Sequence, residues 1–229
     1  MKLIIGIDDT DNLFSRGTGN LARTIAAELG KQFRLLGVTR HQLLIDDRVP
    51  YTSHNSSAAV QLLAPDETNT ETIFAQVSDW MTADYQPGSD PGVCLSVGDV
   101  PGDVTVFGRQ AQSELVSQKD AYELAGQYGI RLAGLSGTHD GVIGALAAVG
   151  LAASGEDGRY LLVGQIREIS GLVPVQQVLA SGVSAVRQLD ETPVEQGYIL
   201  ADKLRPACRG GKPIQYVDWA GEYWQPVKL

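Results

Sequence analysis

Short apolar runs alternate with polar breaks from the first residue onward. Residues 1–7 read Met-Lys-Leu-Ile-Ile-Gly-Ile, a run rich in β-branched side chains that stops abruptly at Asp8, Asp9 and Asp11. A short apolar run bounded by polar residues is typical of a buried strand. The pattern therefore predicts a strand over 2–8 whose end carries three carboxylates.

The next ninety residues continue in helical and extended segments. Apolar residues recur at every fourth position from Leu21, which predicts an amphipathic helix, and short apolar runs predict strands. The expected elements are a helix over 18–30, an extended segment over 33–46, a strand over 58–63, a helix over 65–82 and a strand over 93–97. This order, β-α-β-β-α-β, is that of a ferredoxin-like split unit. We therefore expect an α/β fold of the α+β kind, with this unit over 1–99.

Residues 100–229 show a different pattern and form a second α/β portion in our interpretation. The expected elements are a helix over 110–128 that could break near 117–119, strands over 130–135 and 159–163, a small-residue helix over 142–153, and short strands over 198–201 and 214–219. The pattern leaves open whether this portion is a separate domain or shares one core with the first.

The amino-acid composition is that of an ordinary globular protein. Of the 229 residues, 43% are hydrophobic and 20% charged, which is ordinary for a globular domain. No stretch approaches the roughly 20 apolar residues that span a bilayer, and no signal-peptide pattern is present at the N-terminus. Cys94 and Cys208 lack metal-ligand spacing, so we expect reduced thiols in a cytoplasmic protein without membrane contact.

The chain is acidic, with a net charge of −9. Extended nucleic-acid binding normally needs a basic footprint. We therefore expect a small-molecule substrate, and nucleic acid as a partner only if another protein supplies the contacts. The sequence gives no basis for an oligomeric state.

The acidic turn is the first candidate site. Three carboxylates at the end of a buried strand repel one another unless a positive group lies among them. Mg²⁺ prefers oxygen ligands and usually binds one or two carboxylates together with substrate phosphates. Asp8, Asp9 and Asp11 are therefore candidate metal ligands, with Asp9 also a candidate catalytic residue. The alternative is a solvated acidic turn.

A small glycine-flanked loop precedes the expected helix at 18–30. A strand, an acidic turn, a glycine loop and a helix start can together bind a phosphate through backbone N–H groups. The candidate nucleotide contacts here are Thr10, Gly17, Gly19 and Asn20, and Thr18 is a candidate catalytic residue. The loop has neither the Walker ending nor the dinucleotide-binding glycine spacing.

A second glycine-rich loop repeats this theme, because a strand ends, the loop follows and a helix begins. Its candidate nucleotide contacts are Gly137, His139, Gly141 and Gly144. His139 could be a general base or simply a loop histidine. The small residues from Gly144 onward could equally serve close helix packing.

Two further segments are candidates for substrate binding. Residues 50–57 are dense in small polar groups, among them His54 and Asn55, and could equally form an exposed hairpin loop. Residues 205–212 are the most basic short segment, and Arg209 and Lys212 could hold a phosphate. A plain basic hairpin turn is the alternative for this segment.

Five segments of the chain occur together in one order. They are Gly6-Ile7-Asp8-Asp9-Thr10-Asp11, Gly17-Thr18, Val49-Pro50-Tyr51-Thr52, Pro91-Gly92-Val93 and Gly141-Val142-Ile143-Gly144-Ala145-Leu146-Ala147-Ala148. In this combination the chain resembles the kinase-like N-terminal domain of the archaeal tRNA-isoleucine agmatidine synthetase family. The resemblance covers residues 1–165 approximately.

The resemblance implies ATP and Mg²⁺ as cofactors. The family's domain phosphorylates the cytidine at the anticodon wobble position, and agmatine then displaces the phosphate. The family's phosphorylated threonine falls on Thr18 if the loops align without a gap. Residues 17–20 stand where the family has Cys-Thr-Thr, and residues 52–57, which include no Lys or Arg, stand where the family has a basic segment. No cysteine pairs form a zinc ribbon. We therefore expect a stand-alone homologue without the family's tRNA-binding domains.

These observations favour a Mg²⁺-dependent, ATP-using phosphotransferase or ligase that acts on a small hydroxylated substrate. One alternative is a nucleotide or metabolite sensor that uses the same loops without catalysis. The other is a tRNA-modifying kinase or ligase that needs a partner for RNA binding. The acceptor and any second substrate, such as an amine, stay open.

Overall fold

A computed structural model gives the fold and describes residues 1–10, 17–49 and 55–229. Contacts between residues divide the chain into two units, Met1–Ser154 and Gly155–Leu229. This boundary differs from the one expected after residue 99. The reason is that α5 (Gly141–Ser154) packs on strands of the first unit, so residues 100–154 belong to that unit's core.

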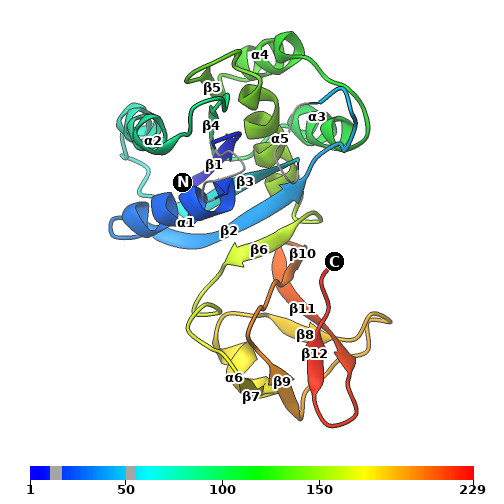
Figure 1. The fold of residues 1–229 in the computed structure, drawn as a ribbon. Helices are drawn as coiled ribbons and strands as arrows, with labels where there is room; N and C mark the ends of the chain where they lie inside the picture. Colours follow the sequence, from blue (N-terminus) through cyan, green and yellow to red (C-terminus); the bar gives the residue numbers. More distant parts are fainter. Residues whose placement is uncertain (11–16, 50–54) are drawn as a thin grey trace. The chain divides into compact units, whose positions relative to one another are not determined.

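The first unit is built on a five-stranded sheet with the order β5-β4-β1-β3-β2 (Figure 1). Its strands are β1 (Lys2–Asp8), β2 (Arg34–Gln42), β3 (Ser56–Leu63), β4 (Gly92–Val97) and β5 (Arg131–Gly134). Every neighbouring pair is antiparallel. The order β4-β1-β3-β2, with helices after β1 and β3, is the expected split β-α-β-β-α-β arrangement. The expected α+β class is confirmed.

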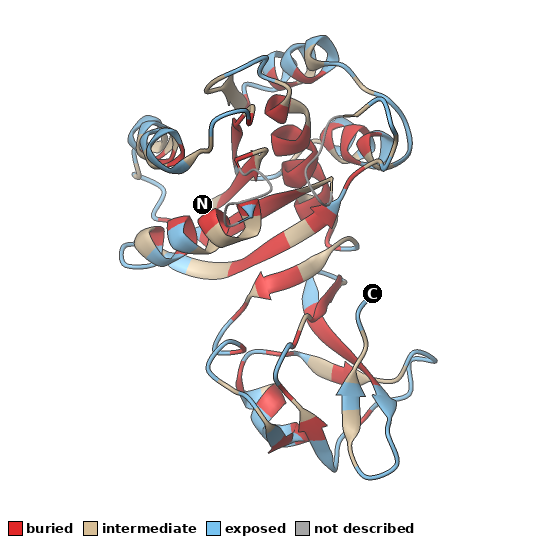
Figure 2. Cartoon of the chain, viewed as in Figure 1, coloured by how far each residue is buried: buried red, intermediate tan, exposed pale blue. Residues whose placement is uncertain are grey.

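Helices cover both faces of this sheet (Figure 1). α1 (Thr18–Leu29) packs on β2 and β3, and α2 (Thr70–Asp84) packs on β4 and α1. α5 covers the other face over β1, β3 and β4, flanked by α3 (Gly102–Ser113) and α4 (Gln118–Gln127). Because β1 is buried on both faces, its sequence reads as a continuous apolar run. α5 is buried along most of its length for the same reason (Figure 2).

Glycines allow α5 to lie directly on the sheet. A Cβ atom placed on Gly6 would lie 2.0 Å from the carbonyl oxygen of Ala145, and one placed on Gly92 would lie 2.1 Å from the carbonyl carbon of Gly141. No side chain fits in either place, since backbone atoms cannot move aside. The glycines therefore bring the first turn of α5 close to the ends of β1 and β4, where the candidate site residues lie.

Most element positions agree with the sequence patterns, with three differences in the first unit. α2 begins at Thr70, five residues after the expected start, because Asn69 caps it by accepting a hydrogen bond from the N–H of Thr72. The expected helix at 110–128 is two helices, and the first begins eight residues earlier, at Gly102. The break expected near 117–119 lies at 114–117. There Ser117 caps α4, with its side chain accepting a hydrogen bond from the N–H of Asp120. Such a cap favours a new helix over the continuation of the old one.

The second unit is rich in short strands. They are β6 (Arg159–Leu162), β7 (Leu172–Pro174), β8 (Ala185–Arg187), β9 (Tyr198–Leu200), β10 (Ala207–Arg209), β11 (Lys212–Trp219) and β12 (Trp224–Pro226), with one short helix, α6 (Val175–Ala180). The order is β6-β10-β11-β12-β9-β7, and β8 pairs with β11. Three-residue strands are too short for periodicity to reveal, so the sequence pattern does not predict β7, β8, β10 and β12. Within the described ranges, no helix is long and apolar enough to cross a membrane.

Candidate functional site

Asp8 lies at the end of β1, under the first turn of α5. A Cβ atom on Gly144 would lie 1.8 Å from Oδ2 of Asp8, so the absence of a side chain at Gly144 makes room for this carboxylate. A negative group near a helix N-terminus is favoured by the helix dipole. Gly144 therefore has a different role from the other small residues of α5, which allow close helix packing. Its lack of a side chain leaves space for the carboxylate of Asp8.

Asp9 follows in a backbone conformation that is uncommon for a residue with a side chain. Its φ is +49°, which lies in the left-handed region and costs roughly 1–2 kcal/mol. Oδ2 of Asp9 accepts a hydrogen bond of 3.1 Å from the N–H of Asp90. The carbonyl of Thr10 accepts one of 3.2 Å from the N–H of Gln86. The loop before β4 thus holds the acidic turn in place.

Thr10 and Thr18 meet at the start of α1. The hydroxyl of Thr10 donates to Oγ1 of Thr18 at 3.1 Å, and the N–H of Thr10 approaches the same oxygen at 3.4 Å. Both threonines are buried, with 3% and 6% exposure. Gly17 precedes the helix without a side-chain cap. The structure thus brings the residue after the acidic pair, Thr10, into contact with the first residue of α1.

Gly19 and Asn20 lie in the first turn of α1. Their oxygens accept hydrogen bonds from Arg23: the carbonyl of Gly19 at 3.0 Å and Oδ1 of Asn20 at 2.9 Å. The N–H of Asn20 donates to the carbonyl of Gly17 at 2.6 Å. A role of these residues in nucleotide binding stays a prediction.

The loop between β5 and α5 is tied to Asp90. The N–H of Thr138 donates to Oδ1 of Asp90 at 2.9 Å, and the N–H of Gly141 donates to its carbonyl at 3.0 Å. The next two N–H groups, of residues 142 and 143, donate to loop carbonyls. These four N–H groups are thus engaged within the protein. The loop would contribute to a ligand mainly through the space and side chains around it.

His139 and Gly137 both have left-handed backbones, with φ values of +69° and +64°. His139 is exposed, and its side chain fills the position that a Cβ atom on Gly134 would take. Gly137 is required by the fold, because a Cβ atom there would lie 1.5 Å from Oδ1 of Asp90. Direct ligand contacts by either residue stay predictions.

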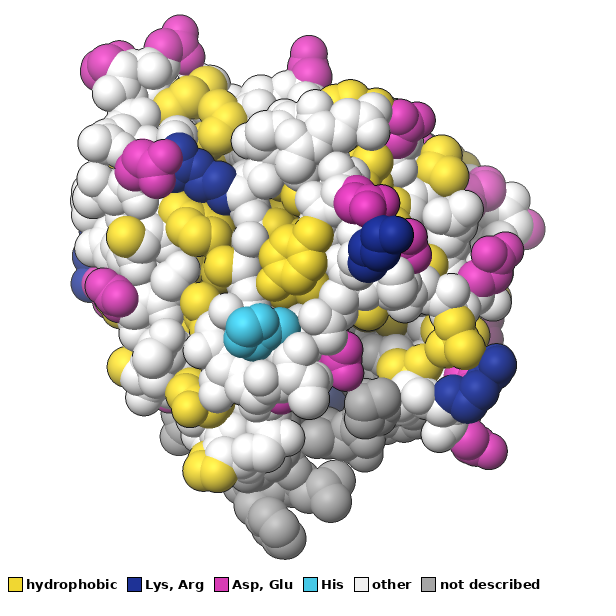
Figure 3. Space-filling model, turned by 90° about the horizontal axis from the view of Figure 1, so that it is seen from above, with side chains coloured by type: hydrophobic (Ala, Val, Ile, Leu, Met, Phe, Trp, Pro, Cys, Tyr) yellow, Lys and Arg dark blue, Asp and Glu magenta, His cyan; other side chains and the backbone are white. Residues whose placement is uncertain are grey.

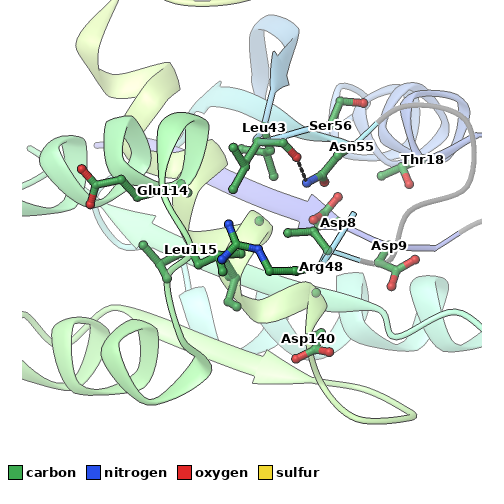
Figure 4. A pocket seen from close by; sticks show the side chains of 17 residues that line it. Asp8, Asp9, Thr18, Leu43, Arg48, Asn55, Ser56, Glu114, Leu115 and Asp140 are labelled. Carbon is green, nitrogen blue, oxygen red and sulfur yellow. Dashed lines mark hydrogen bonds between the residues drawn. The ribbon is translucent and has the colours of Figure 1, made fainter. Parts of the chain in front are cut away.

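A cavity of about 210 Å³ lies beside the acidic turn and the first turn of α5, and all of its lining residues belong to the first unit (Figure 4). Its polar lining consists of Asp8, Asp9, Thr18, Arg48, Asn55, Ser56, Glu114 and Asp140, and its apolar lining of Leu43, Leu44, Val49, Ala111, Leu115, Val116 and Ile143, with Gly141 and Gly144 between. Small-molecule sites measure roughly 300–1,000 Å³. The cavity is therefore large enough for only part of a nucleotide-sized molecule.

Arg48 is the basic side chain among the described lining residues. Nε and Nη2 of Arg48 donate to the two carboxylate oxygens of Asp46 at 2.7 and 2.8 Å. This pairing holds the pKa of Asp46 well below its usual range and raises the pKa of Arg48. In Figure 4 the guanidinium of Arg48 extends toward Leu115, and the carboxylate of Asp8 is on the side of Asn55. A phosphate would bind this edge of the guanidinium only in place of the Asp46 carboxylate.

The donor set fits a Mg²⁺ ion. Asp8 and Asp9 are partly exposed and line the cavity, so hard oxygen ligands face an open space. In the part of the chain that the structure describes, no group of three or more His, Cys, Asp or Glu is arranged to hold a metal. Two carboxylates with substrate phosphates are, however, the usual Mg²⁺ arrangement. Asp11, the third expected ligand, lies outside the described residues.

The expected substrate residues are only partly brought to this site. Asn55 lines the cavity, and its Nδ2 donates to the carbonyl of Leu44 at 2.7 Å. His54 lies outside the described residues. Arg209 and Lys212 face each other in the second unit as the last pair of the β10–β11 hairpin. The two glycines between them have φ values of +57° and +69°, as a two-residue type I′ turn requires.

Several lining residues are not found from the sequence. Leu43, Arg48, Glu114 and Leu115 come from loops and helix ends that carry no motif. Asp140 stands out only as part of the glycine-rich loop. A signal does exist at Asp90, which stands beside the Pro-Gly-Val segment of the resemblance. The other residues meet only because the chain folds back over the end of β1.

Solved structures share the fold of about two thirds of this chain. A tRNA fluorescent labeling enzyme matches with a TM-score of 0.57 and 22% identity, over 66% of this chain and 36% of that one. TiaS, a tRNA agmatidine synthetase, matches in its complex with tRNA and ATP with a TM-score of 0.58 and 21% identity, over 66% and 36%. Apo TiaS matches with a TM-score of 0.56 and 21% identity, over 66% and 35%.

These comparisons define the class of fold. At such identities the likeness shows a TiaS-like fold and nothing finer. The chain spans about a third of the length of the solved structures that it matches. No protein-family model matches the sequence, and no curated protein matches it.

Proposed function

We propose that the chain is a Mg²⁺-dependent, ATP-using phosphotransferase or ligase that acts on a small hydroxylated substrate. One observation carries the proposal: Asp8, Asp9 and Thr18 converge on one cavity, beside Arg48. The fold supports it, because solved structures with this fold include TiaS complexes with ATP and with AMPCPP and agmatine. The expectation of ATP as a cofactor thus rests on both the site and the fold.

The polar end of the cavity would take the phosphates. Asp8 and Asp9 would hold Mg²⁺, together with Asp11 if its side chain reaches the ion. Bound there, the ion would neutralise charge on the phosphate oxygens during transfer. Arg48 would bind phosphate oxygens at the mouth of the cavity. The carboxylates alone would repel a polyphosphate, so these positive groups are needed for binding.

The apolar end would take the nucleobase. Leu43, Leu44, Ala111, Leu115 and Val116 all line the cavity, and the N–H of Leu44 donates to the carbonyl of Ala111 at 3.0 Å. Ligand sites are typically apolar with a few placed polar groups, and Asn55 and Ser56 are such groups here. The faces of a nucleobase would contact the aliphatic side chains, and its polar edge would need hydrogen bonds from groups such as Asn55 and Ser56.

Thr18 would act on the γ-phosphoryl group. Its Oγ1 accepts from Thr10, which fixes the position of this oxygen at the start of α1. It would orient the γ-phosphate or accept it transiently. In transfer to an acceptor, the acceptor's hydroxyl oxygen bonds to phosphorus, the bond from phosphorus to the ADP oxygen breaks, and a nearby carboxylate such as Asp9 takes the hydroxyl proton.

An RNA substrate is the second candidate. It is favoured by the fold, since the matching structures include enzymes named for tRNA. It would require contacts from a partner, because residues 1–154 hold 18 acidic against 10 basic side chains. On the face seen in Figure 3, the described Lys and Arg side chains are scattered among acidic ones.

The test is calorimetric titration with ATP, with and without Mg²⁺, followed by an ADP-release assay. We expect Mg²⁺-dependent binding in the wild type and a loss of at least about tenfold in Asp9→Asn, the usual scale for a disturbed metal site. Asp79→Asn, an exposed change of equal charge on α2, is the control. If Asp9→Asn binds ATP as the wild type does and keeps its Mg²⁺ dependence, the metal assignment is wrong.

A further inference from the structure

Asp90 lies in the loop before β4 and does not line the cavity. Four of its polar groups make hydrogen bonds. Its N–H donates to Oδ2 of Asp9 at 3.1 Å, and its carbonyl accepts from the N–H of Gly141 at 3.0 Å. Oδ1 accepts from the N–H of Thr138 at 2.9 Å, and Oδ2 accepts from the hydroxyl of Thr138 at 2.5 Å. This residue thus connects three segments that are far apart in the sequence.

The surroundings of Asp90 are shaped to receive it. A Cβ atom on Gly137 would lie 1.5 Å from Oδ1 of Asp90, and one on Gly141 would lie 2.2 Å from its carbonyl oxygen. The sequence pattern predicts both glycines as nucleotide contacts. Their lack of side chains has a second effect, because it admits Asp90 into the loop that leads to α5.

The contact with Asp9 matters because Asp9 is strained. A φ of +49° is unfavourable for an aspartate, so the neighbouring structure must hold it. The carboxylate of Asp90 is fixed by Thr138, and this fixes the position of the Asp90 N–H. That N–H in turn donates to Oδ2 of Asp9 and so restrains one oxygen of this carboxylate.

The geometry points to Asp90 as a positioning residue that orients the Asp9 carboxylate toward the metal and ties the acidic turn to the start of α5. This inference rests on the proposed function, since it assigns Asp90 a part in the same Mg²⁺–ATP site. Asp90 acts through Asp9 and does not itself line the cavity. Changing such an outer partner of a ligand typically lowers metal affinity by about 10–100-fold.

The experiment measures the Mg²⁺ concentration at half-maximal ATP binding, by calorimetry at fixed ATP, in full-length protein. We expect Asp90→Ala to raise this midpoint about tenfold or more and Thr138→Val, which removes one of the bonds, to raise it less. Asp79→Asn and Thr82→Val on α2 are the matched controls, and Thr82 also loses a hydroxyl bond, of 2.8 Å to Ser78. Neither control should move the midpoint.

A double variant separates positioning from a general loss of structure. If Asp90 acts through Asp9, adding Asp90→Ala to Asp9→Asn raises the midpoint no further, because effects within one unit do not add. Independent, additive effects would overturn the inference. So would a wild-type midpoint in Asp90→Ala or, if that variant does not fold, in Thr138→Val.

The same measurements distinguish a failure of this inference from a failure of the proposed function. If Asp9→Asn raises the midpoint and the Asp90 and Thr138 variants do not, the positioning role is refuted and the proposed function stands. If the wild-type protein shows no Mg²⁺-dependent ATP binding, the proposed function fails and this inference fails with it.

Discussion

At the scale of single residues, the candidate site depends on small changes of space around carboxylates. Asp8 lies where Gly144 has no side chain, and Asp90 lies where Gly137 has none. Asp9 has a left-handed backbone that the loop before β4 holds in place. The glycines of this site therefore leave space for acidic side chains, in addition to allowing unusual backbone conformations.

Gly144→Ala tests this directly. A Cβ atom 1.8 Å from Oδ2 of Asp8 must displace the carboxylate, so we expect Mg²⁺-dependent ATP binding to weaken at least about tenfold. Replacing a helical glycine by alanine favours the helix by about 1 kcal/mol. We therefore expect weaker Mg²⁺-dependent ATP binding, measured by calorimetry, without a comparable fall in the melting temperature, measured by thermal unfolding.

Gly126→Ala is the matched control for this variant. Gly126 lies in α4 with open space where a Cβ atom would go. We expect it to keep wild-type binding and to melt at the same or a higher temperature. Wild-type Mg²⁺ dependence in Gly144→Ala would show that the position of Asp8 under α5 has no part in ligand binding.

At the scale of elements, α5 determines how the site is assembled. It contacts β1, β3 and β4 and also α3 and α4, so its first turn meets the end of β1 and its flank meets α3, which contributes Ala111 to the cavity. Gly6 and Gly92 set how closely it approaches the sheet. A helix of small residues is needed there because larger side chains would lift it from the sheet.

Gly6→Ala should therefore destabilise the first unit. The added Cβ would lie 2.0 Å from a backbone oxygen of α5, and an overpacked core typically loses about 1–3 kcal/mol. Urea unfolding followed by circular dichroism measures the change. Gly102→Ala, in open space at the start of α3, is the control and should change the free energy of unfolding by less than about 1 kcal/mol. Equal stabilities of the two variants would contradict the close approach of α5 to β1.

At the scale of the whole molecule, charge is unevenly divided between the two units. Residues 1–154 carry 18 acidic and 10 basic side chains, whereas residues 155–229 carry 9 and 8. The candidate site lies in the acidic unit. An acidic surface repels a polyanion over a Debye length of about 10 Å at 0.1 M salt. A small Mg²⁺-bound nucleotide avoids most of this repulsion because the ion accompanies it.

This division predicts that the isolated chain binds RNA weakly. In a filter-binding assay with mixed tRNA at about 50 mM salt, where phosphate contacts are strongest, we expect no complex at low micromolar protein. Mg²⁺–ATP binding by the same preparation shows that the protein is intact. Submicromolar RNA binding that weakens with salt would favour the second candidate, an RNA substrate.

The sequence by itself determined most of the helices and strands in residues 1–99, their β-α-β-β-α-β order and the acidic turn that follows β1. These depend on local periodicity and on neighbours in the chain. Only the tertiary structure decided that residues 100–154 complete the first unit, that Asp90 reaches Asp9, that Gly144 accommodates Asp8, and that Leu43 and Leu115 line one cavity. Such contacts join residues tens of positions apart, and no local pattern records them, because they depend on how closely α5 packs on the sheet.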